Sequence, residues 1–193
     1  VDGRMDAAAA LMHDDPLMSY LHPFVRQASE EFPAALTSIR AQLPVNDGPI
    51  GVLGGSLGGA VALRILADTD IPVFAGAVVN AAIRMRSVVD LFPGDYPYDA
   101  ESEKAVDSLD FLAKADAIAG RAPLLVVSGE LDHPALRADA IRLVARREAD
   151  RGRLLTGLQD GLKAEVDPAS TAVHCWLPAT HRRQTPSRRL TAA

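Results

Sequence analysis

The sequence predicts an α/β fold, a single domain built on a parallel sheet with helices packed against it. Short β-branched apolar runs at residues 50–53, 73–79 and 124–127 alternate with longer segments of helical periodicity, which is the βαβ pattern. The runs show no polar alternation, as in parallel strands buried on both faces. With 193 residues, 48% of them apolar, the chain fits one domain over residues 1–193.

The charge balance and the cysteine content exclude several classes of protein. The formal net charge is −5, so no basic face is expected that would neutralise nucleic-acid phosphates. No uninterrupted apolar stretch approaches the roughly 18 residues of a membrane span, and no secretion signal is expected. The single cysteine, Cys175, excludes an internal disulfide and a cysteine metal cage. We therefore expect a cytoplasmic protein without nucleic-acid or membrane partners, whose oligomeric state stays open.

The helical segments differ in the strength of their pattern. Residues 21–43 carry apolar side chains at three- and four-residue steps, which predicts an amphipathic helix on the sheet, with Pro33 as a point of kinking or splitting. Residues 134–147 predict a second helix. Beyond them the pattern is weaker and predicts a helix over residues 154–166 and a strand over residues 172–177.

The sharpest motif follows the first strand. Gly54-Gly55-Ser56-Leu57-Gly58 is a G-x-S-x-G sequence with a strand before it and a helix after it, the context of a nucleophile elbow. The tight turn strains the serine and requires small neighbours, Gly54 and Gly58. The Leu57 N–H would stabilise an oxyanion at the start of the helix. A phosphate-binding loop fits poorly, because the Lys-Ser/Thr pair of a P-loop and the glycine spacing of a dinucleotide site are missing.

A nucleophilic serine needs a base and an acid that orients the base. Asp132 follows the third strand, on the sheet edge where Ser56 is expected, and the order serine, aspartate, histidine agrees with the motif. The alternative is an ordinary turn aspartate, or a cap for the helix entered at Pro134. Glu130 is a weaker substitute for Asp132.

Five histidines compete for the role of the base. His181 is favoured because it follows a strand and a proline turn. His174 falls inside the expected strand, and His133 adjoins the acid and points away from it. His13 and His22 precede the serine and are expected at the surface. A chain without its own base remains open.

The elbow and the segment 128–133 resemble the α/β-hydrolase fold family, in its bacterial esterase and lipase-like branch with dienelactone-hydrolase and prolyl-oligopeptidase relatives. The resemblance covers about residues 21–147. It implies a parallel αβα sandwich in which Ser56 follows the fifth strand, Asp132 the seventh and the histidine the eighth. It also implies that strands normally precede the elbow, so we expect an incomplete sheet, shortened at the N-terminus, with an exposed apolar edge.

The resemblance further implies that residues 82–122, which are rich in acids, form a helical cap over the nucleophile. Its aromatic side chains would line the substrate pocket, and ordinary packing is the alternative. The lining residues expected are Phe92, Tyr96 and Tyr98, with Leu109 and Phe111 as further candidates. The segment after Asp150 departs from the family pattern, and either a natural tail or an out-of-frame reading would explain its arginine-rich end.

These observations predict a serine hydrolase that cleaves a small carboxylic ester with Ser56, His181 and Asp132, aided by the Leu57 amide, without cofactor or metal. A thioesterase or an oligopeptidase would use the same groups. The alternative from another class is a catalytically impaired or truncated hydrolase-like domain that acts only by binding.

Overall fold

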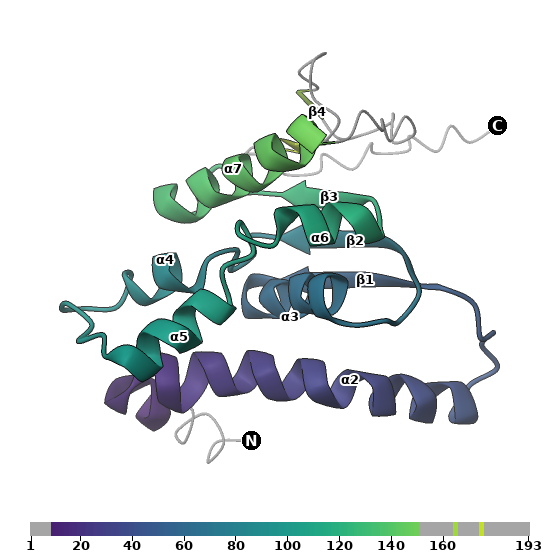
Figure 1. Cartoon of the computed structure of the whole chain (residues 1–193), viewed down its shortest axis with the longest axis horizontal. Helices are drawn as coiled ribbons and strands as arrows, with labels where there is room; N and C mark the ends of the chain where they lie inside the picture. The colour runs from purple at the N-terminus through teal and green to yellow at the C-terminus, as the bar shows by residue number, and fades with distance from the viewer. Residues whose placement is uncertain (1–8, 151–163, 166–173, 176–193) are drawn as a thin grey trace, which may run out of the picture.

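A parallel sheet forms the centre of the computed structural model, which describes residues 9–150, 164–165 and 174–175 (Figure 1). The strand order is β1-β2-β3-β5-β4. Strands β1, β2, β3 and β5 are parallel to one another, and β4 runs antiparallel to β5. The α/β class is thereby confirmed. The strands are β1 (Ile50–Gly55), β2 (Val73–Val79), β3 (Leu124–Val127), β4 (Ala164–Glu165) and β5 (His174–Cys175).

The helices begin and end close to the predicted positions. The predicted helix 21–43 is a π-helical turn followed by α2, and α2 continues through Pro33, so the proline does not split it. The helices are η1 (Pro16–Leu21), α2 (His22–Gln42), α3 (Ser56–Asp68), α4 (Met85–Val89), α5 (Ala100–Ser108), α6 (Ala115–Arg121) and α7 (Pro134–Asp150).

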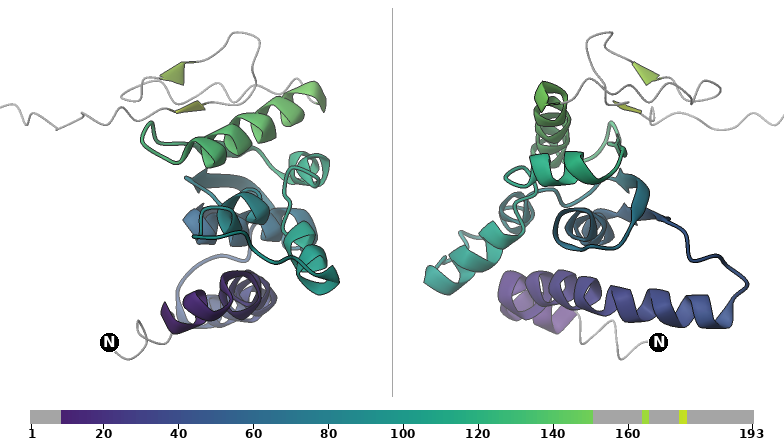
Figure 2. Two further views of the ribbon diagram at one scale, coloured as in Figure 1. Left: turned by 90° about the vertical axis from the view of Figure 1, so that its left-hand side faces the viewer. Right: turned by 45° about the vertical axis from the view of Figure 1, so that its right-hand side comes forward.

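The helices cover the sheet unevenly. Helix α3 packs on β1 and β2, while α2 and α7 lie at opposite ends of the sheet with α3 between them (Figure 2). Along β1, Val52 is buried, whereas Leu53 on the other face is 76% exposed. Phe74 in β2 is 63% exposed. In the described part of the chain β1 pairs only with β2, so it is an edge strand with apolar side chains, as predicted.

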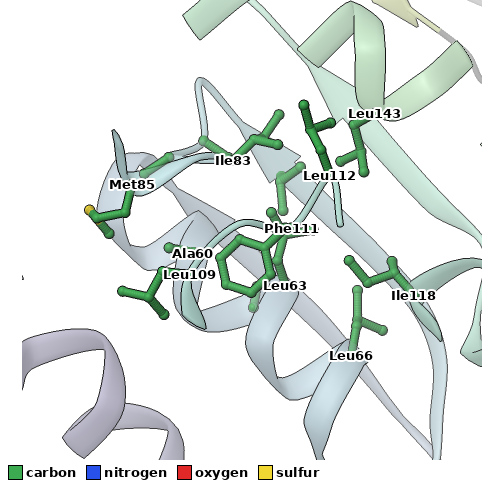
Figure 3. Close-up of a cluster of buried hydrophobic side chains, with 14 of the residues drawn as sticks. Ala60, Leu63, Leu66, Ile83, Met85, Leu109, Phe111, Leu112, Ile118 and Leu143 are labelled. Carbon is green, nitrogen blue, oxygen red and sulfur yellow. The ribbon is translucent and has the colours of Figure 1, made fainter. Parts of the chain in front are cut away.

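The segment 82–122 is helical, as expected, but both of its halves contribute side chains to the main core. Helix α6 packs against α3 and α7. Leu109 and Phe111 are fully buried, so for these two residues the packing alternative is correct (Figure 3). Helices α4 and α5, in contrast, lie beyond the carboxyl ends of the strands (Figure 1). Figure 3 shows the core around Phe111, formed by Ala60, Leu63, Leu66, Ile83, Met85, Leu109, Leu112, Ile118 and Leu143.

The C-terminal elements differ in part from the prediction. The helix expected over residues 154–166 is wrong at Ala164–Glu165, which form strand β4. Backbone pairing with β5 determines this conformation, and it overrides a weak helical pattern that glycines interrupt. Strand β5 falls within the predicted strand 172–177 and pairs with β3. The remainder of both predictions lies outside the described residues.

Within the described ranges, none of the helices is both long enough and apolar enough to span a bilayer.

Candidate active site

Ser56 stands at the junction of β1 and α3, where the chain turns sharply. Its φ is +49°, in the left-handed region that non-glycine residues rarely adopt. Such a conformation costs on the order of 1–3 kcal/mol and persists only where the surrounding structure enforces it. The side chain is exposed at the carboxyl end of β1. The strained, exposed serine predicted from the motif is confirmed.

Two glycines, Gly54 and Gly59, make this turn possible, and only Gly54 was predicted to be required. A Cβ on Gly54 would lie 2.1 Å from the carbonyl oxygen of Gly58, and a Cβ on Gly59 would lie 2.5 Å from the Ala81 Cβ. Apart from its chain neighbours and the backbone of its own helix, no described atom lies within 4 Å of the Cβ that Gly58 would carry. The requirement for glycine is therefore confirmed at Gly54 and wrong at Gly58. The carbonyl of Gly58 makes the close approach, while its Cα faces open space.

The Leu57 amide lies at the N-terminal end of α3, and its role as an oxyanion donor stays a prediction. Leu57 lies in the first turn of α3, where backbone N–H groups have no carbonyl four residues earlier in the helix to bind. Gly55, at the N-cap, supplies no side-chain cap. The Leu57 side chain packs against the core, which fixes this turn. The helix dipole adds positive potential at the same end.

Hydrogen bonds connect this turn to the loops that follow the next two strands. The Ala82 amide donates to the Ser56 carbonyl oxygen at 3.0 Å. The Asn80 side-chain Oδ1 accepts from the Gly129 amide at 2.7 Å. Asn80 itself has a φ of +45°. Asn80 was not among the predicted site residues. An asparagine directly after an apolar strand could have indicated it, since asparagine tolerates the left-handed conformation.

Asp132 lies in the loop between β3 and α7 and is partly buried. Its amide donates to the Gly129 carbonyl at 3.1 Å, and its Oδ1 accepts from the His133 amide at 2.8 Å. His133 Nδ1 accepts from the Ala135 amide at 3.3 Å, so His133 caps α7. Among the histidine side chains that the structure describes, none forms a hydrogen bond or an ion pair with the carboxylate of Asp132. Glu130 is exposed, and its backbone carbonyl accepts from Arg137 at 3.1 Å.

The other four histidines differ in their position along the chain. His181, the predicted base, lies outside the described residues. His174 lies in β5 beside Val126 of β3. His13 is exposed, as expected, but His22 is partly buried. Burial, followed by the positive charge of Arg64, lowers the pKa of His22.

Two of the three aromatic residues predicted to bind substrate line a hollow that does not include the serine. Phe92 and Tyr96 line a cavity of about 570 Å³ together with residues around the start of η1, and Ser56 is not among its lining residues. The Tyr96 hydroxyl donates to Asp15 at 2.8 Å, and burial, with this hydrogen bond, raises the pKa of Tyr96. Tyr98 lies under the Arg86 guanidinium, 4.4 Å from the ring centre. Their role in substrate binding stays a prediction.

No group of three or more potential metal ligands occurs in the described part of the chain. A scan against protein-family models finds no match to this chain, and a search of curated proteins finds no relative.

Proposed function

We propose that this protein is a serine hydrolase that cleaves a small carboxylic ester through an acyl-enzyme on Ser56. The observation that supports this most directly is the left-handed, solvent-exposed serine between a parallel strand and a helix N-terminus. A purely structural turn with positive φ would favour glycine, which adopts it without strain. A serine there presents a hydroxyl group at the edge of the sheet where α/β proteins bind ligands.

In this mechanism the Ser56 hydroxyl attacks the ester carbonyl carbon while His181 accepts its proton. The negative charge that forms on the carbonyl oxygen is stabilised by the Leu57 amide. The tetrahedral species collapses, the C–O bond to the alcohol breaks, and the histidine returns the proton to the leaving alcohol. A water molecule then attacks the acyl-serine with the same histidine as base, releasing the acid. Asp132 orients the imidazole and stabilises its charged form.

The strand arrangement also supports the hydrolase type of fold. The strands β1, β2, β3 and β5 are adjacent, parallel and in chain order. The resemblance implies this arrangement for the strands that carry the serine, the acid and the histidine. Helices α4 and α5 lie beyond the carboxyl ends of the strands, where the resemblance places a cap (Figure 1). A cytoplasmic location and a small-molecule ester substrate are part of the same proposal.

A binding-only domain is the second candidate, favoured by a different observation. The edge strand β1 and the exposed Leu53 and Phe74 offer apolar surface for another polypeptide. A thioesterase or an oligopeptidase would share the groups of the ester hydrolase.

Reaction of the full chain with a fluorophosphonate probe separates these functions. Ser38→Ala is a matched control, because Ser38 is an exposed serine on α2. We expect labelling of the parent and of Ser38→Ala, and loss of labelling in Ser56→Ala and in His181→Ala. A folded parent that remains unlabelled would refute the hydrolase and favour the binding domain. Labelling that survives Ser56→Ala would refute Ser56 as the nucleophile.

A further inference from the structure

We propose that Asn80 is a positioning residue that fixes the loop carrying Asp132 relative to Ser56. This inference rests on the proposed hydrolase function and extends it to a residue outside the predicted triad. Asn80 immediately follows β2, the strand between the one that ends at the serine and the one that leads to the acid.

The backbone of Asn80 is itself strained. Ser56 and Asn80 are the two non-glycine residues with positive φ in the described part of the chain. Asn80 is exposed, so burial of its side chain does not explain why the conformation is kept. Asparagine is one of the few side chains that tolerate the left-handed region, because it is short and bonds to nearby backbone. The strain is therefore offset by what this residue binds.

Asn80 holds the start of the acid loop at two points. Its amide donates to the carbonyl of Val127, the last residue of β3, at 2.9 Å. Its Oδ1 accepts from the Gly129 amide at 2.7 Å. The side chain also lies against Gly129, since a Cβ there would be 3.5 Å from the Asn80 amide nitrogen and oxygen. These contacts bracket Ser128, so both the last strand residue, Val127, and the second loop residue, Gly129, are fixed by one side chain and its backbone.

The same short segment is fixed to the nucleophile turn. The Ala82 amide donates to the Ser56 carbonyl at 3.0 Å, and Ala81 lies where a side chain on Gly59 would be. On the other side, the Asp132 amide donates to the Gly129 carbonyl at 3.1 Å and closes the acid loop. A continuous chain of backbone and side-chain contacts thus runs from Ser56 through residues 80–82 to Asp132.

This connection matters because the carboxylate must hold the imidazole in one orientation. Catalytic groups need to be held within about 0.5 Å of the productive geometry, and a displacement of about 1 Å can cost roughly a hundredfold in rate. The loop bearing Asp132 is partly exposed, and the Asn80 bond is a long-range restraint on it. Loss of that bond is expected to lower kcat and to leave KM nearly unchanged, because in this proposal Asn80 acts through the loop and not by binding the substrate.

Two substitutions separate the hydrogen bond from the backbone conformation. Asn80→Gly removes the Oδ1 acceptor but adopts a positive φ without strain, so it does not unfold the turn. Asn80→Asp keeps an acceptor oxygen at the same place and also tolerates the left-handed region. We expect Asn80→Gly to lower kcat for a short-chain p-nitrophenyl ester about tenfold or more, and Asn80→Asp to restore most of it.

A double-variant cycle tests whether Asn80 acts through the acid. If it does, Asn80→Gly combined with Asp132→Asn should be no slower than Asp132→Asn alone, because contacts that act together are non-additive. Fully additive losses, or a parental kcat in Asn80→Gly, would overturn the proposal while the hydrolase function stands. A parental kcat in Asp132→Asn would overturn it as well.

Amide hydrogen exchange of the full chain gives a readout that is independent of activity. The Gly129 amide should exchange roughly threefold to tenfold faster in Asn80→Gly than in the parent or in Asn80→Asp, as expected for one hydrogen bond. If the parent does not react with ester or probe, the hydrolase function fails, and faster exchange would still support the restraint of the loop by Asn80. Unchanged Gly129 exchange in Asn80→Gly overturns the proposal whatever the activity.

Discussion

The substitution Gly54→Ala tests the geometry of the serine turn most sharply. The added Cβ would lie 2.1 Å from the Gly58 carbonyl oxygen and 2.8 Å from the Gly59 nitrogen. Contacts under 3.0 Å are essentially never seen for a real Cβ, so β1 and the first turn of α3 must separate by about 0.9 Å, the difference between 3.0 and 2.1 Å. Both partners are backbone, which cannot move aside by changing a rotamer.

The expected loss lies at the upper end of what overpacking costs, about 3 kcal/mol. For a chain of this size that corresponds to a fall in Tm of roughly 6–12 °C. The matched control is Gly58→Ala in the same motif, where the Cβ has no described neighbour within 4 Å. Replacement of a helical glycine should there be neutral or stabilise by roughly 0.5–1 kcal/mol.

Thermal unfolding followed by circular dichroism, with urea titrations at 25 °C, measures both variants against the parent. Equal losses for Gly54→Ala and Gly58→Ala would show that the two glycines are equivalent and would refute the close approach described here. A parental Tm for Gly54→Ala would refute it as well.

Three further predictions concern strain, a buried charge and a helix cap. Ser56→Gly should relieve the positive-φ strain and raise the free energy of unfolding by about 1 kcal/mol while abolishing probe labelling; a urea titration showing lower stability would contradict this. Replacing Asp139, which is 1% exposed and lies 3.2 Å from Arg142 and 3.9 Å from Arg84, by Ala should lower the free energy of unfolding by about 1–2 kcal/mol, less than for a fully buried pair because Arg142 is largely exposed; an unchanged urea midpoint would contradict the pairing. Hydrogen bonds from the Ser102 amide and hydroxyl lower the pKa of Asp99. The stabilisation of the folded protein by the ionised Asp99 carboxylate is therefore present above the unfolded pKa near 4 and is lost as the pH falls through the folded value. Asp99→Asn keeps a capping oxygen that does not titrate, so the Tm advantage of the parent at pH 6 should disappear at pH 2; a constant difference would refute the linkage.

The fold class, the main strands and the long helices could be predicted because their signals are local. The apolar runs 73–79 and 124–127 correspond directly to β2 and β3, and the helical stripe of residues 21–43 gave the position of α2 to within a residue or two. The strained serine was also predictable, because the turn between strand and helix is specified by five consecutive residues. Local sequence determines these features before any tertiary contact forms.

The features that escaped prediction depend on contacts between distant segments. Gly59 has its packing role only because Ala81, from the loop after the next strand, lies against it. Asn80 is separated by 49 residues from its partner Gly129. Gly58 looked essential from the motif alone, yet its Cα faces open space once β1 and α3 are in place. The expected participation of Leu109 and Phe111 in a pocket failed for the same reason, because the core that buries them comes from several elements.

The position of a covalent adduct tests the central claim most directly. The full chain is mixed with p-nitrophenyl acetate, and the reaction is quenched in acid within the first turnover. The protein is then digested and mapped by mass spectrometry. The proposed function predicts an acetyl group on Ser56, a burst of p-nitrophenol close to one equivalent per chain, and neither signal in Ser56→Ala. An acetyl group on another residue, or turnover that persists in Ser56→Ala, would contradict an acyl-enzyme on Ser56.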